Sequence, residues 1–481
     1  MENLRSIILS LKPNEVQLVR DFYAVKTQKH NSKRLQLFEL VLHTQQATDL
    51  EAAQLIYRRQ PDSAFSQLKR RLKEDVLNFL MACPNDKATT NAALQAELSA
   101  QKMHMQGKLL LARGVREEAF NLLKKAQGLA EKYELTALQI EVNDTLMANS
   151  CITTMPGQVA SYSNRLSQCL HVQDQLLHAK ALKYRLGMAA ASVEPNGQAN
   201  LLAELSALKN TYEQTNSAKV GYWYYQCAIQ YHLSQHGYST AHTLGNDLLQ
   251  LVNTHPALKT EANVAGIHME LSRILIHLGR YCQAVEHANK AKGLYKNGVL
   301  HELFALEALF FGCFRSQDYA HAAKIIHKAE KHQQYKSNEW LPNQWAFLKA
   351  GLYFTQQKFT DSLRLLRQIN TFRKGNSTWA LGLKLLEMLN LIEQGEYDWF
   401  ESKIETFRKQ LQPAGKPAMG RCKLIYKVFN TLNRTSFDYK HTVSIEEHNL
   451  QSLNEGRDGL YWDPMGYELI PVNHWIETKA G

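Results

Sequence analysis

The sequence predicts an all-α protein built from stacked helical hairpins, and three observations support this prediction. Residues that favour helices (Leu, Ala, Gln, Lys and Glu) dominate the composition, and runs rich in Val, Ile and Thr are nearly absent. A pattern of small and large apolar residues recurs along the chain. The length of 481 residues exceeds what one compact core usually supports, so several domains or an elongated array are expected.

The repeat is clearest at Gly114, Ala119, Leu123 and Ala126. A glycine suits the tight turn between two antiparallel helices, and small residues let the second helix approach its neighbours. One such hairpin cannot bury its apolar stripe alone, so each is expected to stack on the next. Further copies of the pattern are Gly279, Ala284, Ala288 and Ala291; Tyr319, Ala322, Ile326 and Ala329; Phe359, Ser362, Leu366 and Ile369; Gly395, Tyr397, Phe400, Ile404 and Phe407; and, upstream, Tyr238, Ala241, Gly245 and Leu248.

This pattern resembles the tetratricopeptide repeat, whose consensus positions Gly107, Leu110, Gly114, Ala119, Leu123 and Ala126 match. The spacing of 38–43 residues is longer than the standard ~34, so "TPR-like" describes it better. The resemblance implies a right-handed α-solenoid of about eight or nine hairpins. Residues 135–215, in which the consensus is degraded, are predicted to form hairpins by period only, with room for three further units between Ala126 and Leu248.

The whole chain also resembles a group of uncharacterised bacterial helical-repeat proteins. The resemblance rests on IILSLKPNEVQLVRDF (7–22), LQLFELV (35–41), and the segments 109–134, 383–409 and 468–479. These motifs are structural and imply no activity. The predicted organisation is an N-terminal helical cap (1–85), a TPR-like array (86–412), and a C-terminal helix with an aromatic capping segment (413–481).

In tetratricopeptide-type arrays, the first helix of each hairpin lines a concave groove. Cations and aromatic rings there would suit an extended peptide or a partner protein, although the larger apolar residues could equally be core. The groove positions carried over from the resemblance are Gln101, His104, Lys108, Trp223, Gln226, Gln230, Met269, Arg273, Phe311, Arg315, Gln344 and Phe347.

The first 85 residues are expected to contain helices at 13–28, 31–46, 49–58 and 61–81. In the last of these, Phe65, Leu68, Leu72, Val76 and Phe79 form one apolar stripe. A turn followed by a basic helix within residues 54–80 would also suit a DNA-reading helix-turn-helix, but pairs such as Arg70–Glu74 and Arg71–Asp75 favour a solvated face of a cap. The cations concerned are Arg58, Arg59, Lys69, Arg70, Arg71 and Lys73.

The C-terminal segment carries Tyr461, Trp462, Tyr467 and Trp475, which are too many aromatic residues for an unstructured tail. We expect these side chains to pack against the last hairpin and close the array. The alternative is a self-docking peptide that occupies the groove. Before this segment, residues 413–421 are predicted to be a loop and residues 423–434 a helix.

The sequence offers no catalytic constellation. It has no glycine-rich phosphate loop and no nucleophile elbow, and the i,i+4 pair His232 and His236 has no obvious third metal ligand. The seven cysteines form no CxxC pair and are interpreted as small buried side chains in a reducing compartment: Cys83, Cys151, Cys169, Cys227, Cys282, Cys313 and Cys422. We therefore expect no enzyme activity, cofactor or metal.

No apolar stretch is long enough to be a signal peptide core or a membrane span, which favours the cytoplasm. The net charge of +11 is a mild bias over this length. The sequence therefore predicts a non-enzymatic scaffold or adaptor that binds a peptide or partner protein in the groove. The alternative is a regulator that contacts DNA through its N-terminal helices and senses a ligand through the repeats.

Overall fold

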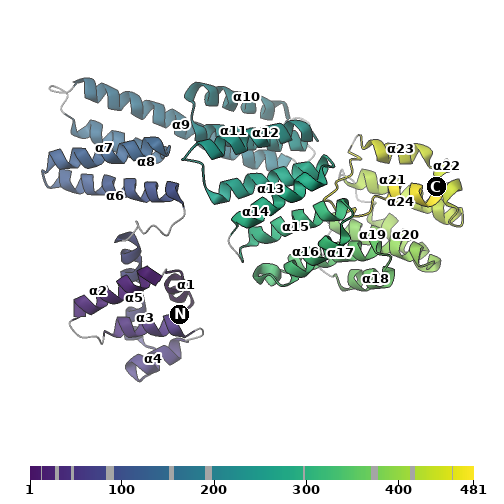
Figure 1. Ribbon diagram of the computed structural model, residues 1–481, viewed down its shortest axis with the longest axis horizontal. Coiled ribbons are helices and arrows are strands. Elements are labelled where there is room, and N and C mark those ends of the chain that lie inside the picture. Colours follow the sequence, from purple (N-terminus) through teal and green to yellow (C-terminus); the bar gives the residue numbers. More distant parts are fainter. Residues whose placement is uncertain are drawn as a thin grey trace. The chain divides into compact units, whose positions relative to one another are not determined.

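The computed structural model describes residues 1–11, 13–27, 32–44, 48–82, 91–150, 156–189, 198–295, 298–369, 378–411, 418–457 and 459–481. Regular structure in these ranges is entirely helical, as the composition predicts (Figure 1). None of the described helices is long and apolar enough to cross a membrane. The chain divides into two compact units, Met1–Ala130 and Glu131–Gly481, and the boundary between them falls within one helix. The boundaries expected near residues 85 and 412 lie outside the described residues.

The N-terminal unit begins with a small helical bundle. Four of its helices lie close to the predicted ranges, and Pro13 is the first residue of its helix, where its missing N–H has no partner to lose. The first helix was not predicted. The predicted stripe is buried from Phe65 to Val76, and Phe79 at its end packs partly buried against this core. The five helices are α1 (Glu2–Leu9), α2 (Pro13–Thr27), α3 (Lys33–His43), α4 (Asp49–Tyr57) and α5 (Ser63–Ala82).

The first hairpin consists of α6 (Ala92–Ala112) and α7 (Arg116–Lys132). Gly107 lets the two helices approach, because a Cβ there would lie 2.8 Å from Leu123 Cγ. Leu123, Ala119 and Ala126 are all fully buried, as the repeat predicts.

Regular hairpins resume further along the chain and form most of the second unit, in which α13 to α20 lie side by side in chain order (Figure 1). Their helices are α11 (Ala218–Ser234), α12 (Tyr238–Thr254), α13 (Glu261–His277), α14 (Tyr281–Leu294), α15 (Leu300–Arg315), α16 (Tyr319–Glu330), α17 (Trp340–Thr355), α18 (Phe359–Gln368), α19 (Thr378–Glu393) and α20 (Tyr397–Gln410), with a short 3₁₀ helix η2 (Gln333–Lys336) before α17.

In each of these hairpins, and in the first hairpin, the turn between the two helices places one residue in the left-handed conformation. This residue occupies the same position of the repeat every time. Only three of the six residues are glycine, so the backbone keeps the turn where the sequence signal has faded. The residues and their φ angles are Gly114 (79°), His236 (55°), Gly279 (71°), Gln317 (64°), Gln357 (60°) and Gly395 (72°).

Residues 135–215 follow the predicted period but not the predicted hairpins. They contain α8 (Thr136–Asn149), α9 (Pro156–Ala189) and α10 (Gln198–Thr215). The early part of α9 contacts α8, and its later part packs against α10 and α11. One helix of 34 residues thus serves as the second helix of one unit and the first of the next. The turn expected within this segment is absent, and residues 158–186 contain neither Pro nor Gly.

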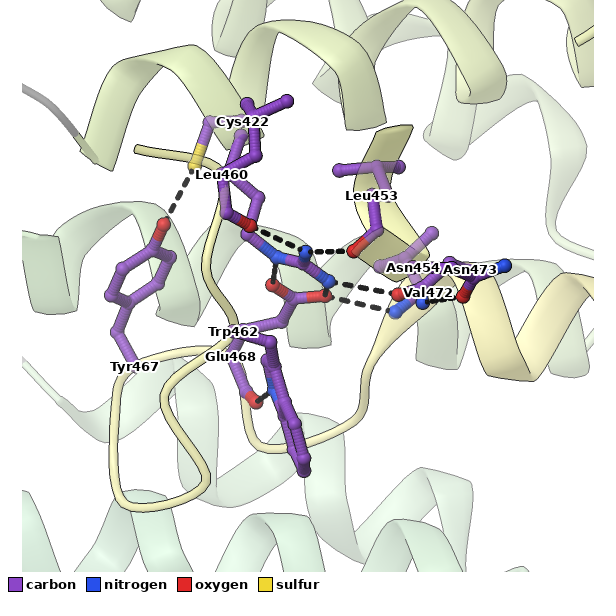
Figure 2. Close-up of polar contacts among 10 residues, drawn as sticks. Cys422, Leu453, Asn454, Leu460, Trp462, Tyr467, Glu468, Val472 and Asn473 are labelled. Carbon is purple, nitrogen blue, oxygen red and sulfur yellow. Dashed lines mark hydrogen bonds and ion pairs between the residues drawn. The ribbon is translucent and has the colours of Figure 1, made fainter. Parts of the chain in front are cut away.

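The chain ends in α21 (Ala418–Arg434), α22 (Tyr439–Ile445), α23 (Glu447–Glu455) and α24 (Val472–Ala480). Residues 459–470, which we call the strap, connect α23 to α24 without regular helix. Arg421 on α21 fixes the two ends of the strap through Leu460 and Glu468 (Figure 2).

The cysteines agree with the sequence analysis in part. Cys227, Cys313 and Cys422 are buried free thiols, whereas Cys282 is exposed, contrary to expectation. Cys282 is the second residue of α14 and faces away from the stripe that begins at Ala284. Cys83 and Cys151 lie outside the described residues.

Candidate peptide-binding surface

Two groups of hydrogen-bonded polar side chains lie on the first helices of the array and on the long helix before them. Lys183 on α9 bonds to Gln226 on α11, whose Nε2 donates to Glu270 Oε2 on α13 at 3.2 Å. On the next two hairpins, Gln344 Nε2 of α17 donates to Glu307 Oε1 of α15 at 2.7 Å. We call the six residues Lys183, Gln226, Glu270, Arg273, Glu307 and Gln344 the polar row.

The polar row lies within helices that are otherwise strongly apolar. Around Glu307, α15 buries Leu303, Leu306 and Phe310. A carboxylate in such surroundings is costly unless it is hydrogen-bonded, and a glutamine from the neighbouring hairpin supplies a donor to each of the two glutamates. The row is therefore a specific feature that hydrophobic packing does not require.

The two glutamates of the polar row lie in a largely desolvated environment. Both side chains keep partial contact with solvent, and yet burial raises the pKa of Glu270 and of Glu307 above the ordinary 4.5. The positive charge of Arg273 acts on both carboxyls and opposes this rise in pKa. Arg273 itself is exposed and forms no ion pair with described residues.

Aromatic side chains border one end of the polar row. Trp223 on α11 is half-buried, and the Nζ atoms of Lys180 and Lys183 lie 5.9 Å and 5.7 Å from its ring centroid. Tyr222 stands edge-on to Trp223, with ring centroids 5.6 Å apart. Rings, cations and partly exposed carboxylates therefore occur together on this surface.

The structure divides the predicted groove residues into several groups. Gln226, Arg273 and Gln344 belong to the polar row, and Trp223 borders it. Gln226 and Gln344 are 6% and 8% exposed, so they hold the two glutamates in place and do not themselves face a partner. Gln230 is half-buried nearby on α11. Gln101 and Lys108 are exposed in the N-terminal unit, where His104 is buried.

Three predicted groove residues are corrected to core residues. Phe311 and Phe347 are fully buried and Met269 is 8% exposed, so none of these side chains is free to contact a partner. These helices are packed on several sides, so their large apolar residues fill the space between hairpins.

Sequence reasoning missed Glu270, Glu307 and Lys183. A signal was present for Glu307, which interrupts the apolar run FALEALFFGCF (304–314). A lone carboxylate in an apolar helix needs a buried partner, but the sequence does not say which residue of another hairpin provides it.

The C-terminal strap contacts the first helices, as the self-docking alternative predicts, and also the last helices, as the capping prediction requires. Arg315, a predicted groove residue, donates from Nε to Pro464 O at 2.8 Å and from Nη1 to Leu469 O at 2.7 Å. On the other side, the Tyr467 hydroxyl lies 3.4 Å from Cys422 Sγ of α21 (Figure 2).

Half of the basic residues considered for DNA binding are paired. Arg59 contacts Asp62, Lys69 contacts Asp49 at 2.6 Å, and the predicted Arg70–Glu74 pair is present at 3.6 Å. The expected Arg71–Asp75 pair is absent, because Asp75 instead accepts from Arg34 and Tyr23. Arg58, Arg71 and Lys73 are exposed.

The pair His232 and His236 gains no third metal ligand. His236 instead stacks on Tyr461 of the strap with ring centroids 4.5 Å apart. No group of three metal-ligating side chains occurs in the ranges that the structure describes.

No protein-family model matches this sequence, and no curated protein matches it. Two solved structures are similar at 12% identity. The apo form of RapI has a TM-score of 0.46 over 67% of this chain and 87% of its own. A STAND protein with a tetratricopeptide repeat sensor from Pyrococcus horikoshii has a TM-score of 0.31 over 90% of this chain and 65% of its own.

The hairpins, their shared left-handed turn and their buried small residues give the fold of the array. It is a tetratricopeptide-like helical repeat. The fold is assigned from the geometry of this chain alone.

Proposed function

We propose that this protein is a non-enzymatic interaction scaffold that binds an extended segment of a partner protein along the polar row. The observation that carries the proposal is the row itself: partly exposed carboxylates with raised pKa, near the exposed cation Arg273, which forms no ion pair with the described residues. Groups held in this way can exchange hydrogen bonds with a partner backbone and pair with its charges.

The test is affinity capture of the tagged protein from its own cells, followed by mass spectrometry. Arg273→Glu reverses the charge at the centre of the polar row, and we expect a stoichiometric partner to be lost. Lys324→Glu, which reverses an exposed cation on the second helix α16, is the matched control and should keep it. Equal capture by both variants, or turnover of a substrate by the purified protein, would refute the proposal.

The DNA-contacting alternative has weaker support, because three of its six cations are already paired with carboxylates. It predicts that duplex DNA binds and that binding weakens steeply with salt. Replacing Arg70, Arg71 and Lys73 with Gln should then abolish the binding. DNA that co-purifies with the wild type and vanishes with this variant would favour the alternative over the scaffold.

A further inference from the structure

The strap and α24 together contact the ends of three first helices at one repeated position. His277, Arg315 and Glu393 are the last residues of α13, α15 and α19, and each contacts the C-terminal part of the chain. His277 Nδ1 lies 3.2 Å from the Tyr461 hydroxyl, and Glu393 accepts from Trp475 Nε1 at 2.8 Å. The strap thus contacts α13 and α15 at this repeated position, and α24 contacts α19 there.

Arg315 holds the middle of the strap by hydrogen bonds to the backbone and by one ring contact. Its guanidinium bonds to the carbonyls of Pro464 and Leu469 and lies 4.6 Å from the Trp462 ring centroid. Nη2 is buried and has no hydrogen-bond partner among the described residues. Burial lowers the pKa of Arg315 to about 10, and the charges of Asp463 and Glu468 offset only part of this shift.

Arg421, at the base of the strap, differs from Arg315 because its guanidinium has a carboxylate partner. It pairs with both carboxylate oxygens of Glu468, at 2.5 Å and 3.1 Å, and donates to two backbone carbonyls and to Asn473 (Figure 2). The base of the strap is therefore firmly fixed, whereas the Arg315 contact lacks a counter-ion.

Two glycines admit the strap closely. A Cβ on Gly382 of α19 would lie 2.2 Å from the backbone oxygen of Tyr467, and one on Gly351 of α17 would lie 2.6 Å from Leu469 Cδ1. Glycine in a helix costs about 1 kcal/mol relative to alanine, so these positions favour close contact with a backbone over helix stability.

The chemistry of the strap differs from that of the chain that holds it. It carries Tyr461, Trp462 and Tyr467 together with two carboxylates, Asp463 and Glu468, on a protein of net charge +11. Tyr461 inserts beside three rings, those of His236, Tyr238 and His277. Asp463 Oδ1 lies 3.6 Å from His277 Nε2. The docked segment is thus a folded loop, closed by the bonds Gly466 N to Asp463 O and Trp462 Nε1 to Glu468 O, and it is aromatic and acidic.

We propose that the strap is an internal ligand that occupies a peptide-binding site across α13, α15, α17 and α19, and that an aromatic and acidic segment of a partner displaces it. A partner carboxylate at Arg315 Nη2 would supply the acceptor that the strap lacks, which gives the partner an advantage over the strap. This site shares no residue with the polar row, so the proposal goes beyond the proposed scaffold function and identifies the chemistry of the segment that binds at the strap.

The test uses a fluorescent peptide of residues 459–471 and the full-length protein. Tyr461→Ala/Trp462→Ala loosens the strap, and we expect this variant to bind the peptide at least tenfold more tightly than the wild type, measured by fluorescence anisotropy. Adding Gly382→Ala to the loosened variant should abolish the gain, because the new Cβ blocks the peptide backbone while favouring helix α19.

Amide hydrogen exchange verifies each protein: residues 459–470 should exchange faster in the loosened variant, with α13–α19 unchanged. Trp462→Ala alone replaces the double variant if those helices are affected. A loosened, native-like variant that binds the peptide no better than the wild type would overturn the inference, as would a strap whose exchange does not change. A cellular partner captured equally with and without the loosening would overturn it too, while leaving the scaffold function intact.

Discussion

On the first helices of the array, some side chains are buried in the core and others keep contact with solvent and can bind a partner. Phe347 and Glu307 lie on neighbouring first helices, but Phe347 is fully buried and Glu307 keeps contact with solvent. Gln344 satisfies one oxygen of Glu307 without neutralising its charge. The folded state therefore still carries the free-energy cost of desolvating the Glu307 carboxylate. Such a cost is typical of residues that take part in binding.

The raised pKa of Glu307 has a consequence for stability. A carboxyl whose folded pKa lies above its unfolded value favours folding below the unfolded pKa, and that contribution is lost as pH rises through the folded pKa. Glu307→Gln keeps the hydrogen-bond acceptor and removes the charge. We therefore expect the melting temperature of the variant to exceed that of the wild type more at pH 8 than at pH 5.

Scanning calorimetry at the two pH values measures this difference. Glu286→Gln, an exposed residue of α14, is the control and should change little at either pH. A difference that is the same at both pH values, or a Glu307→Gln variant that is less stable at pH 8, would contradict the prediction.

Helical hairpins keep their turn geometry even where glycine has been replaced. Gly279, Gln317 and Gln357 share the left-handed conformation, and the backbone of each closes its turn with the same hydrogen bonds. Glycine adopts this conformation without strain, whereas other L-residues pay for it.

Gly279→Ala should lower the free energy of unfolding by about 1 kcal/mol, because the added Cβ meets no neighbouring atom and only the backbone conformation is penalised. Gln317→Gly should have a smaller effect of opposite sign, because relief of strain is offset by the greater freedom of glycine in the unfolded chain. Urea unfolding of both variants measures the two changes in the free energy of unfolding. An equal loss in both would mean that side-chain contacts, not φ, control these turns.

Taken as a whole, the chain has several cores rather than one. The N-terminal bundle has its own buried cluster, which includes Leu37, Phe38 and Leu72 and shares no residue with the clusters of the array. Clusters between successive hairpins are expected of a repeat protein, in which each unit packs mainly on its neighbours. The right-handed sense of the solenoid stays a prediction.

Separate cores should unfold in separate steps. Phe38→Ala removes a fully buried ring and should destabilise the N-terminal bundle by about 3–5 kcal/mol. Calorimetry should show the unfolding transition of the N-terminal bundle at a lower temperature, with the other transitions unchanged. Leu55→Ala, which truncates a residue 68% exposed on α4, should move neither. A uniform shift of all unfolding would show that the two units are coupled.

The sequence by itself determined the class of fold, the period of the array and the buried small residues, because these follow from local helix preference and from offsets of three and four residues. It also indicated Arg273, Gln226 and Gln344 as polar positions on first helices. Only the tertiary structure decided that α9 is continuous, that Phe311 and Phe347 are core, that Glu270 and Glu307 complete the polar row, and that Arg315 holds the strap. Each of these depends on contacts between residues far apart in the chain, and the repeat pattern carries no information about such pairs.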